Sequence, residues 1–177
     1  MAYLIRAITR AKWEPKDDLN ENEISADVFI DLRTTASKLS FWICEQPGHM
    51  EELEEIVLAI ASCRDKLEKV DIVWIDKKVL ESEGITFEFE PGKTPVEDLK
   101  ELHLNAIKLD IFRLEKIALT IAEAIRNYNH FHRFSRKEIE RLFRNALDTG
   151  RLNIEDLKPT LKEELEKRTS NLKRSNS

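Results

Sequence analysis

The chain has 177 residues, of which 41% are hydrophobic and 36% are charged, and its formal net charge at neutral pH is −5. This length usually makes one domain, and mixed charges combined with regular apolar patterns argue against a disordered chain. No apolar run approaches the roughly 18 residues that a membrane-spanning helix needs, and the first residues lack the basic and apolar regions of a signal peptide. We therefore expect a cytoplasmic protein without a membrane partner.

The charge is distributed unevenly along the chain. Residues 1–128 contain 17 Lys and Arg against 26 Asp and Glu, a net charge of −9. Residues 129–177 contain 12 Lys and Arg against 8 Asp and Glu, a net charge of +4. Such an asymmetry concerns partners rather than fold, because the acidic part attracts basic proteins and the basic part attracts polyanions.

The first third of the chain predicts three strands. Residues 1–9 are weakly alternating and apolar, and residues 14–25 form a polar, Asn- and Asp-rich loop. Residues 26–33 alternate with period two and residues 39–44 are aromatic and β-branched, so we expect these two segments to form a hairpin. In the second predicted strand, one face would carry the apolar residues Val28, Ile30 and Leu32. The other face would carry Asp27, Phe29 and Asp31.

The middle of the chain predicts a covering helix and two more strands. Apolar residues at spacings of three and four predict a helix over 50–68, and the short apolar run 70–75 is typical of a core strand. Residues 77–83 predict a helical turn that ends at Gly84, and residues 85–89 alternate as a strand.

A long helix is predicted from Thr94 to Tyr128, because Thr94 and Glu97 fit a capping box and a heptad seam follows. The seam consists of Leu104, Ile107, Ile111, Leu114, Ala118, Ile121, Ile125 and Tyr128. A second, partial apolar stripe contains Leu109, Phe112 and Leu119. A helix that is apolar on two sides packs on its own domain with one side, so the other side is available to a partner, including a second copy in a homodimer.

Two shorter helices complete the expected fold. Ser135 and Glu138 form a second capping box, and a last helix starts near Asn153, with Pro159 close to its first turn. We expect an α+β fold: about five strands in a mixed or mainly antiparallel sheet with one covering helix, then a three-helix C-terminal region that contains the heptad helix. The sheet region would span 1–92, the helical region packed on it 93–168, both within a single domain, and a disordered tail 169–177.

Phosphate-loop and zinc-site patterns do not fit this sequence. Gly92-Lys93-Thr94 resembles the end of a phosphate-binding loop, but Phe87 stands where the motif needs its first glycine. The four histidines and two cysteines lack the spacings of a structural zinc site, and Cys44 and Cys63 lie in apolar segments typical of buried free thiols. We therefore expect neither a cofactor nor a metal.

One short segment suggests catalysis. Arg126-Asn127-Tyr128-Asn129-His130-Phe131-His132 resembles the Arg-polar-x4-His motif of HEPN ribonucleases. The resemblance covers these seven residues and implies that Arg126 and His132 are the catalytic pair, with Asn127 in support. The family fold is an all-helical bundle, whereas the first half of this chain indicates a sheet. The other interpretation is a polar helix end followed by an interhelical turn.

The leading functional hypothesis is a non-enzymatic protein-binding or regulatory protein, such as an inhibitor, an immunity-type protein or an accessory subunit. It would meet a partner protein, favourably a basic one, with an acidic sheet face formed by Asp27, Asp31, Glu88 and Glu90. The alternative is an RNA-directed nuclease or nucleic-acid-binding protein. It would use Arg126 and His132 together with a basic helix stripe of Arg133, Lys137, Arg141 and Arg144.

Overall fold

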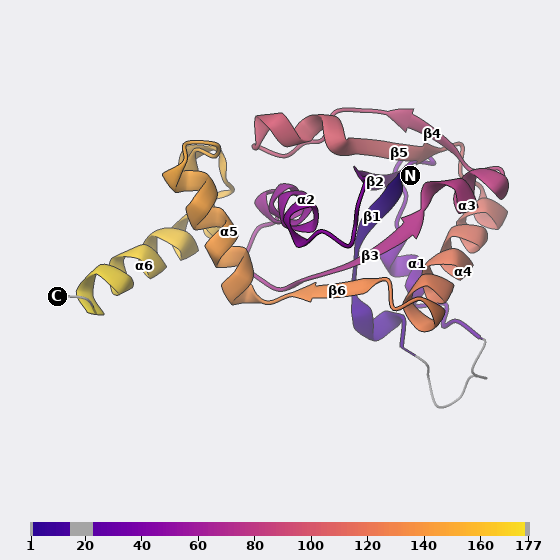
Figure 1. The fold of residues 1–177 in the computed structure, drawn as a ribbon, viewed down its shortest axis with the longest axis horizontal. Coiled ribbons are helices and arrows are strands. Elements are labelled where there is room, and N and C mark those ends of the chain that lie inside the picture. The colour runs from indigo at the N-terminus through magenta and orange to yellow at the C-terminus, as the bar shows by residue number, and fades with distance from the viewer. Residues whose placement is uncertain (1, 15–22, 176–177) are drawn as a thin grey trace.

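The computed structural model describes the backbone of residues 2–14 and 23–175, and side chains as far as residue 168. Its centre is a six-stranded antiparallel sheet with the strand order β4-β5-β2-β1-β3-β6 (Figure 1). The strands are β1 (Tyr3–Ile8), β2 (Leu39–Cys44), β3 (Val70–Asp76), β4 (Thr86–Phe89), β5 (His103–Ile107) and β6 (Phe131–Phe134).

The helices lie on both faces of this sheet. They are α1 (Val28–Asp31), α2 (Met50–Ser62), α3 (Lys77–Ser82), α4 (Ile111–Asn127), α5 (Arg136–Asp148) and α6 (Pro159–Ser175). Three short 3-10 helices connect them: η1 (Arg10–Lys12), η2 (Glu97–Leu102) and η3 (Ile154–Asp156). The α+β class predicted from the sequence is therefore confirmed.

Strand β1 lies in the middle of the sheet because it is apolar on both faces. It pairs antiparallel with β2 and with β3, so that Leu4 lies between Ile43 and Ile75. Leu4 and Ile5 point to opposite faces and both are completely buried. Each face of the sheet therefore needs its own cover, and the buried side chains divide into two clusters.

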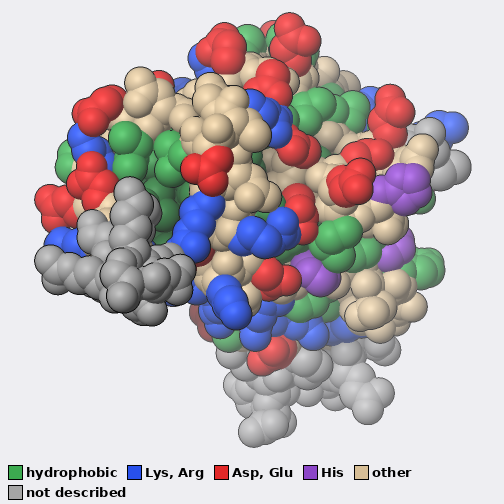
Figure 2. All heavy atoms as spheres, turned by 60° about the vertical axis from the view of Figure 1, so that its left-hand side comes forward, with side chains coloured by type: hydrophobic (Ala, Val, Ile, Leu, Met, Phe, Trp, Pro, Cys, Tyr) green, Lys and Arg blue, Asp and Glu red, His purple; other side chains and the backbone are tan. Residues whose placement is uncertain are grey.

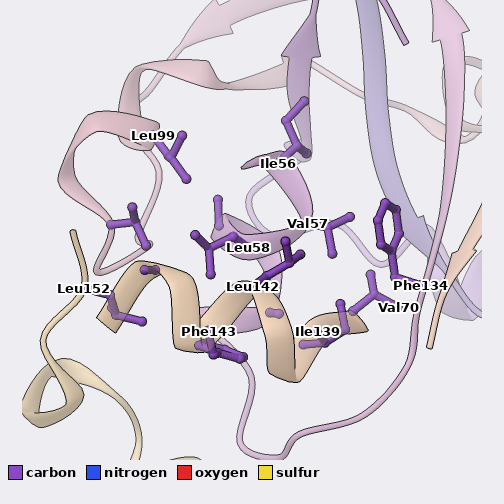
Figure 3. Packing of buried hydrophobic residues seen from close by; sticks show 14 of the residues in the cluster. Ile56, Val57, Leu58, Val70, Leu99, Phe134, Ile139, Leu142, Phe143 and Leu152 are labelled. Atoms are coloured by element: carbon purple, nitrogen blue, oxygen red, sulfur yellow. The ribbon is translucent and has the colours of Figure 1, made fainter. Parts of the chain in front are cut away.

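The first cluster lies under α2, α5 and α6, which we call the α5 layer. Ile5 and Ile72 from the sheet belong to this cluster. Figure 3 shows Val57 of α2 and Phe143 of α5, which belong to the same cluster. Leu161 and Leu165 add α6 to the same cluster. Helix α5 begins where the sequence predicts, because the Ser135 side chain accepts from the Glu138 backbone N–H and the Glu138 carboxylate accepts from the Ser135 N–H.

The second cluster lies under α1, α3 and α4, which we call the α4 layer. Ile117, Ile121 and Ile125 of α4 pack against the opposite face of the sheet, together with Leu80 of α3 and Val28 of α1. The two layers are separated by the sheet in Figure 1. The sheet is thus covered on both faces, and the prediction of one covering helix is wrong.

Residues 26–33, predicted as a strand, form the short helix α1 instead. Val28, Ile30 and Leu32 do not lie on one face of a sheet. Val28 and Leu32 are buried, whereas Ile30 is 63% exposed. Val28 and Leu32 are four residues apart, which places them on one side of a helical turn. The predicted hairpin between 26–33 and 39–44 is therefore wrong, and β2 pairs with β1 and β5.

The predicted long helix is also interrupted. Residues 97–102 form the 3-10 helix η2 and residues 103–107 form β5, so within the predicted helix only residues 111–127 are α-helical. Strand β5 lies between β2 and β4 and pairs with both. Thr94 caps no α-helix; its hydroxyl accepts from the Val96 N–H and lies 2.9 Å from the Ser62 hydroxyl. Inside the sheet, backbone pairing on two sides outweighs the heptad pattern of the side chains.

Two further boundaries differ from the prediction. The segment 93–168 is not purely helical, because it contributes β5 and β6 to the sheet, and β6 occupies the place of the expected interhelical turn. The predicted disordered tail 169–177 is helical as far as Ser175, where α6 ends, and residues 176 and 177 lie outside the described part of the chain.

Candidate protein-binding surface

Exposed apolar side chains gather on the α4 layer. Among the described residues, eight large hydrophobic side chains are exposed, and six of them belong to α1, α3, α4 or the C-cap of α4: Ile30, Val79, Ile111, Phe112, Leu119 and Tyr128. The α5 layer carries one, Met50, at the start of α2. Single exposed apolar residues need no explanation, but a concentration on one layer does.

Helix α4 places these side chains by its periodicity. The N-cap Asp110 accepts a hydrogen bond from the Arg113 N–H at 2.8 Å and starts the helix. The helix turns Ile117 and Ile121 to the sheet, whereas Phe112 is 72% exposed and Leu119 is 50% exposed. Phe112 and Leu119 are seven residues apart and therefore share one outward face. The second apolar stripe of the sequence is thus exposed at two of its three members; the third, Leu109, is buried.

A small groove between α1 and α4 adjoins this face. Its volume is about 290 Å³, close to the lower end of small-ligand pockets. It is lined by Glu23, Ile24, Ser25, Val28, Phe29, Glu115, Ala118 and Leu119. We call the outward face of α4 together with this groove the α4 surface. Its apolar floor and the acidic side chains at its margin suit an apolar side chain carried on a basic partner.

Helix α1 is held against the sheet by Asp31. The Asp31 carboxylate accepts hydrogen bonds from the Thr9 N–H at 2.6 Å, from Lys12 Nζ at 2.9 Å and from Trp13 Nε1 at 2.9 Å. Burial raises the pKa of this carboxyl, but the hydrogen bonds outweigh burial and leave the pKa below its ordinary value. The groove is therefore bounded on one side by an anchored turn.

A half-buried arginine adds to this anchor. The Arg6 guanidinium donates to the Asp31 backbone carbonyl at 2.5 Å and to the Ser40 carbonyl at 2.6 Å. Burial lowers the pKa of Arg6 to about 10, although the nearby Asp31 carboxylate favours the charged form. Arg6 also lies over the Phe41 ring, with 5.8 Å between its guanidinium carbon and the ring centroid.

The four predicted acidic residues do not form one sheet face. Asp27 is exposed at the N-terminus of α1, and the Asp31 carboxylate is occupied by its three donors. Glu88 belongs to the edge strand β4 and Glu90 follows it, and both form ion pairs with Lys38, at 3.3 Å and 3.0 Å. The expected acidic sheet face is wrong because residues 26–33 are not a strand.

The predicted basic stripe is also divided. Arg133 lies on β6, where it donates two hydrogen bonds to the buried Asp71 carboxylate, at 2.6 Å and 2.9 Å. Lys137, Arg141 and Arg144 lie on α5, where Arg141 pairs with Glu54 and Arg144 with Glu140. Three of the four residues therefore share a helix, and Arg133 instead ties the edge strand to β3.

Arg126 and His132 point to opposite sides of the sheet. Arg126 donates to the Glu23 carbonyl at 2.8 Å, on the α4 layer. His132 lies opposite Ile72 in the β3–β6 pair and packs edge-on against Phe134, on the α5 layer. The geometry implied by the HEPN resemblance is therefore not formed, and β6 is the reason, since the resemblance implies helices on both sides of the motif.

The segment that resembles a phosphate loop is a packing turn. A Cβ atom on Gly92 would lie 2.8 Å from the Trp42 ring, so only glycine fits there. Both cysteines are free, and burial, followed by the nearby Glu52, raises the pKa of Cys44 to about 12. In the part of the chain that the structure describes, no three His, Cys, Asp or Glu side chains are grouped to hold a metal, and no helix there is long and apolar enough to cross a membrane.

Comparisons of this chain with protein-family models, with curated proteins and with solved structures give no match. The sequence patterns do not mark the groove residues Ile24 and Phe29, because Ile24 falls in the predicted loop 14–25 and Phe29 in the predicted strand 26–33. The signal that was available is the second stripe of α4, which marked Phe112 and Leu119.

Proposed function

We propose that this chain is a non-enzymatic protein-binding or regulatory protein that presents its α4 surface to another protein. One observation carries the proposal: six of the eight large exposed hydrophobic side chains in the described structure lie on the α4 layer. Apolar surface that stays exposed on a folded protein costs solubility, so its concentration on one layer favours an interface.

The chemistry of the α4 surface favours a partner that carries a protruding apolar side chain surrounded by basic side chains. The groove beside Leu119 has room for one inserted side chain, and central apolar anchors of this kind dominate binding energy at interfaces. Glu115 lines the groove, and Asp27 and Glu123 are exposed near its margin. Two cations lie nearby: Lys116, which is paired with Glu83 at 2.9 Å, and Arg126, which donates to the Glu23 carbonyl at 2.8 Å. The acidic side chains outnumber them, so the rim is acidic on balance.

The experiment compares three forms of the full chain immobilised on a resin: wild type, Leu119→Lys and Met50→Lys. Met50 is the matched control, since it is 43% exposed and lies on the opposite layer. From a native-host lysate, wild type and Met50→Lys should retain a protein that Leu119→Lys does not. The purified candidate should then bind wild type in a calorimetric titration, at least about tenfold more tightly than it binds Leu119→Lys.

Two outcomes would contradict the proposal. If no retained protein distinguishes Leu119→Lys from Met50→Lys, the α4 surface is not a recognition surface. If light scattering shows a wild-type dimer that Leu119→Lys converts to a monomer, the occupant is a second copy of this chain rather than a different protein.

A further inference from the structure

An open groove lies on the α5 layer, on the side of the molecule opposite the α4 surface. Its volume is about 1130 Å³, larger than the roughly 300–1,000 Å³ typical of small-molecule pockets. It is lined by Arg136, Lys137, Glu138, Glu140, Arg141, Arg144, Asn145, Asp148 and Arg168. Figure 2 turns this side of the molecule toward the viewer and shows Lys and Arg side chains gathered across the middle and lower part of the face.

Two of these arginines are anchored on one buried carboxylate. Glu140 is 9% exposed, and its two carboxylate oxygens accept from different helices. Arg144 of α5 donates to one oxygen, and Arg168 of α6 donates to the other at 2.7 Å. A guanidinium has five N–H donors, so each arginine retains donors that Glu140 does not use. The carboxylate therefore fixes two guanidinium groups at the groove while neutralising one of the two charges.

The cations of the groove are more exposed than the carboxylates that pair with them. Five lining residues are Lys or Arg and three are Asp or Glu, and Arg136 and Arg141 also pair with Glu164 and Glu54, which lie outside the lining. The side chains of Arg141 and Glu54 are 50% and 24% exposed, and those of Arg144 and Glu140 are 39% and 12% exposed, so the groove presents guanidinium groups to solvent. One of the three carboxylates, Glu138, is engaged at the N-terminus of α5, where it accepts from the Ser135 N–H at 2.7 Å. Lys137, Arg141 and Arg144 follow one another at spacings of four and three, on the face of α5 opposite the buried Ile139 and Ala146.

We propose that this groove binds the phosphodiester backbone of a nucleic acid, without reading its base sequence. Fixed guanidinium groups recognise phosphate oxygens through paired N–H donors, and Lys137 adds a mobile charge. Lys137 and Arg144 are seven residues apart, about 10 Å along the helix, which spans about three nucleotide steps of a strand. The groove is open rather than enclosed, so a bound strand can extend beyond it.

The expected binding is weak and sensitive to salt. Residues 1–128 carry a net charge of −9 and repel a polyanion, so contact is confined to the groove. Two to four phosphate contacts predict a loss of about 10- to 150-fold in affinity between 50 and 200 mM salt. This inference does not depend on the proposed function, because the groove and the α4 surface lie on opposite layers.

The test measures fluorescence anisotropy of labelled 20-nucleotide single strands and duplexes of mixed sequence with the full chain. Wild type should bind the oligonucleotide at 50 mM salt, and its affinity should fall by about 10- to 150-fold at 200 mM salt. The double variant Arg144→Gln and Arg168→Gln should bind at least about tenfold more weakly and show a shallower salt dependence. The control Arg151→Gln removes the same kind of charge outside the groove, where Arg151 pairs with Glu55 and Asp98, and should change affinity less than about twofold.

A further variant tests the anchoring role of Glu140. Glu140→Gln makes the groove more positive by one charge, so a groove that acts by net charge alone would bind the oligonucleotide more tightly. Binding weaker than wild type identifies Glu140 as a positioning residue, whereas tighter or unchanged binding shows that the anchor is unnecessary. If the double variant fails to fold, as judged by circular dichroism, Lys137→Gln replaces it, with an expected loss of about threefold.

Three results would overturn the phosphate proposal. One is the absence of binding by wild type at 50 mM salt. Another is an equal loss of affinity in Arg151→Gln and in the double variant. The third is competition by poly-glutamate as strong as competition by unlabelled oligonucleotide, which would assign the groove to an acidic protein instead.

Discussion

The two helical layers cover the same sheet but differ in their outer surfaces. The α5 layer is joined across its elements by ion pairs: Arg141 with Glu54, Arg168 with Glu140, Arg136 with Glu164, and Arg151 with Glu55 and Asp98. On the outer face of the α4 layer, the ion pair of Lys116 with Glu83 joins α4 to the end of α3. The α4 layer also carries exposed apolar side chains there.

The comparison indicates that buried side chains attach both layers to the sheet. The surface charges of the α5 layer have a different role. Exposed ion pairs contribute little to stability, about 0–1 kcal/mol each, so the pairs of the α5 layer mainly fix side-chain positions. Buried residues such as Ile117 and Ile121 attach the α4 layer to the sheet. The side chains on its outer face do not contribute to this attachment. One layer therefore presents oriented cations, and the other presents apolar area.

The largest expected effect comes from the core of each layer. Phe143→Ala in the α5 layer should lower the free energy of unfolding by about 3–5 kcal/mol, and Ile121→Ala in the α4 layer by about 2–5 kcal/mol, because both side chains are fully buried. Urea denaturation followed by circular dichroism and by tryptophan fluorescence measures both values. Two separate transitions in either variant would show that the two layers unfold independently, although they share one sheet.

The next effect concerns the anchor of α1. Asp31→Asn should lower the free energy of unfolding by about 2 kcal/mol, since it weakens the charge-assisted bonds from Thr9, Lys12 and Trp13. The control is Asp27→Asn, in the same turn but exposed and without a capping hydrogen bond, which should be nearly neutral. Equal effects of the two substitutions in urea denaturation would contradict the anchoring role.

A smaller effect should appear as pH falls. Burial raises the pKa values of Asp31 and Asp71, but hydrogen bonds from their partners outweigh it, so both lie below the unfolded-state value. The unfolded chain then binds more protons in acid, so stability is full above about pH 5 and declines as pH falls toward the folded-state pKa values. Urea midpoints between pH 3 and pH 7 should show this decline, and Asp31→Asn should make it shallower. An unchanged slope in that variant would assign the decline to other groups.

The smallest effect on stability is expected at the α4 surface. Phe112→Ser and Leu119→Ser should each change the free energy of unfolding by less than about 0.5 kcal/mol, because both side chains are at least half exposed. Thermal denaturation checks this directly. A loss of several kcal/mol would mean that these residues belong to the core, and the contrast between the layers would disappear.

Several elements could be predicted from local sequence because their signals are complete within a few residues. Strand β2 occupies residues 39–44 as predicted, and Ser135 starts α5 through its own capping box. The helical turn before Gly84 ends where glycine adopts a positive φ of 79°. The last helix was also expected, but it begins at Pro159 rather than near Asn153, because Asn153 instead caps the 3-10 helix η3.

The wrong secondary-structure predictions arise where the same residues fit both the two-residue period of a strand and the period of a helix. Val28 and Leu32 match both an alternating strand and one side of a helical turn, and contact with the sheet together with the Asp31 anchor decides for the turn. Residues 103–107 continue a heptad pattern, yet they pair with β2 and β4. A local sequence pattern does not show which other segment of the chain will become a neighbouring strand. The pairing of residues 103–107 with β2 and β4 could therefore not be predicted from the sequence.

By itself, the sequence determined the α+β class, most element positions, the change of charge along the chain and the second apolar stripe of α4. These follow from local periodicity, capping and composition, which act within a few turns of the chain. Only the tertiary structure decided that the sheet is covered on both faces, that Arg126 and His132 are separated by it, and that Arg144 and Arg168 meet at Glu140. Each of these depends on contacts between residues far apart in sequence, whose energies exceed local preferences once the chain is compact.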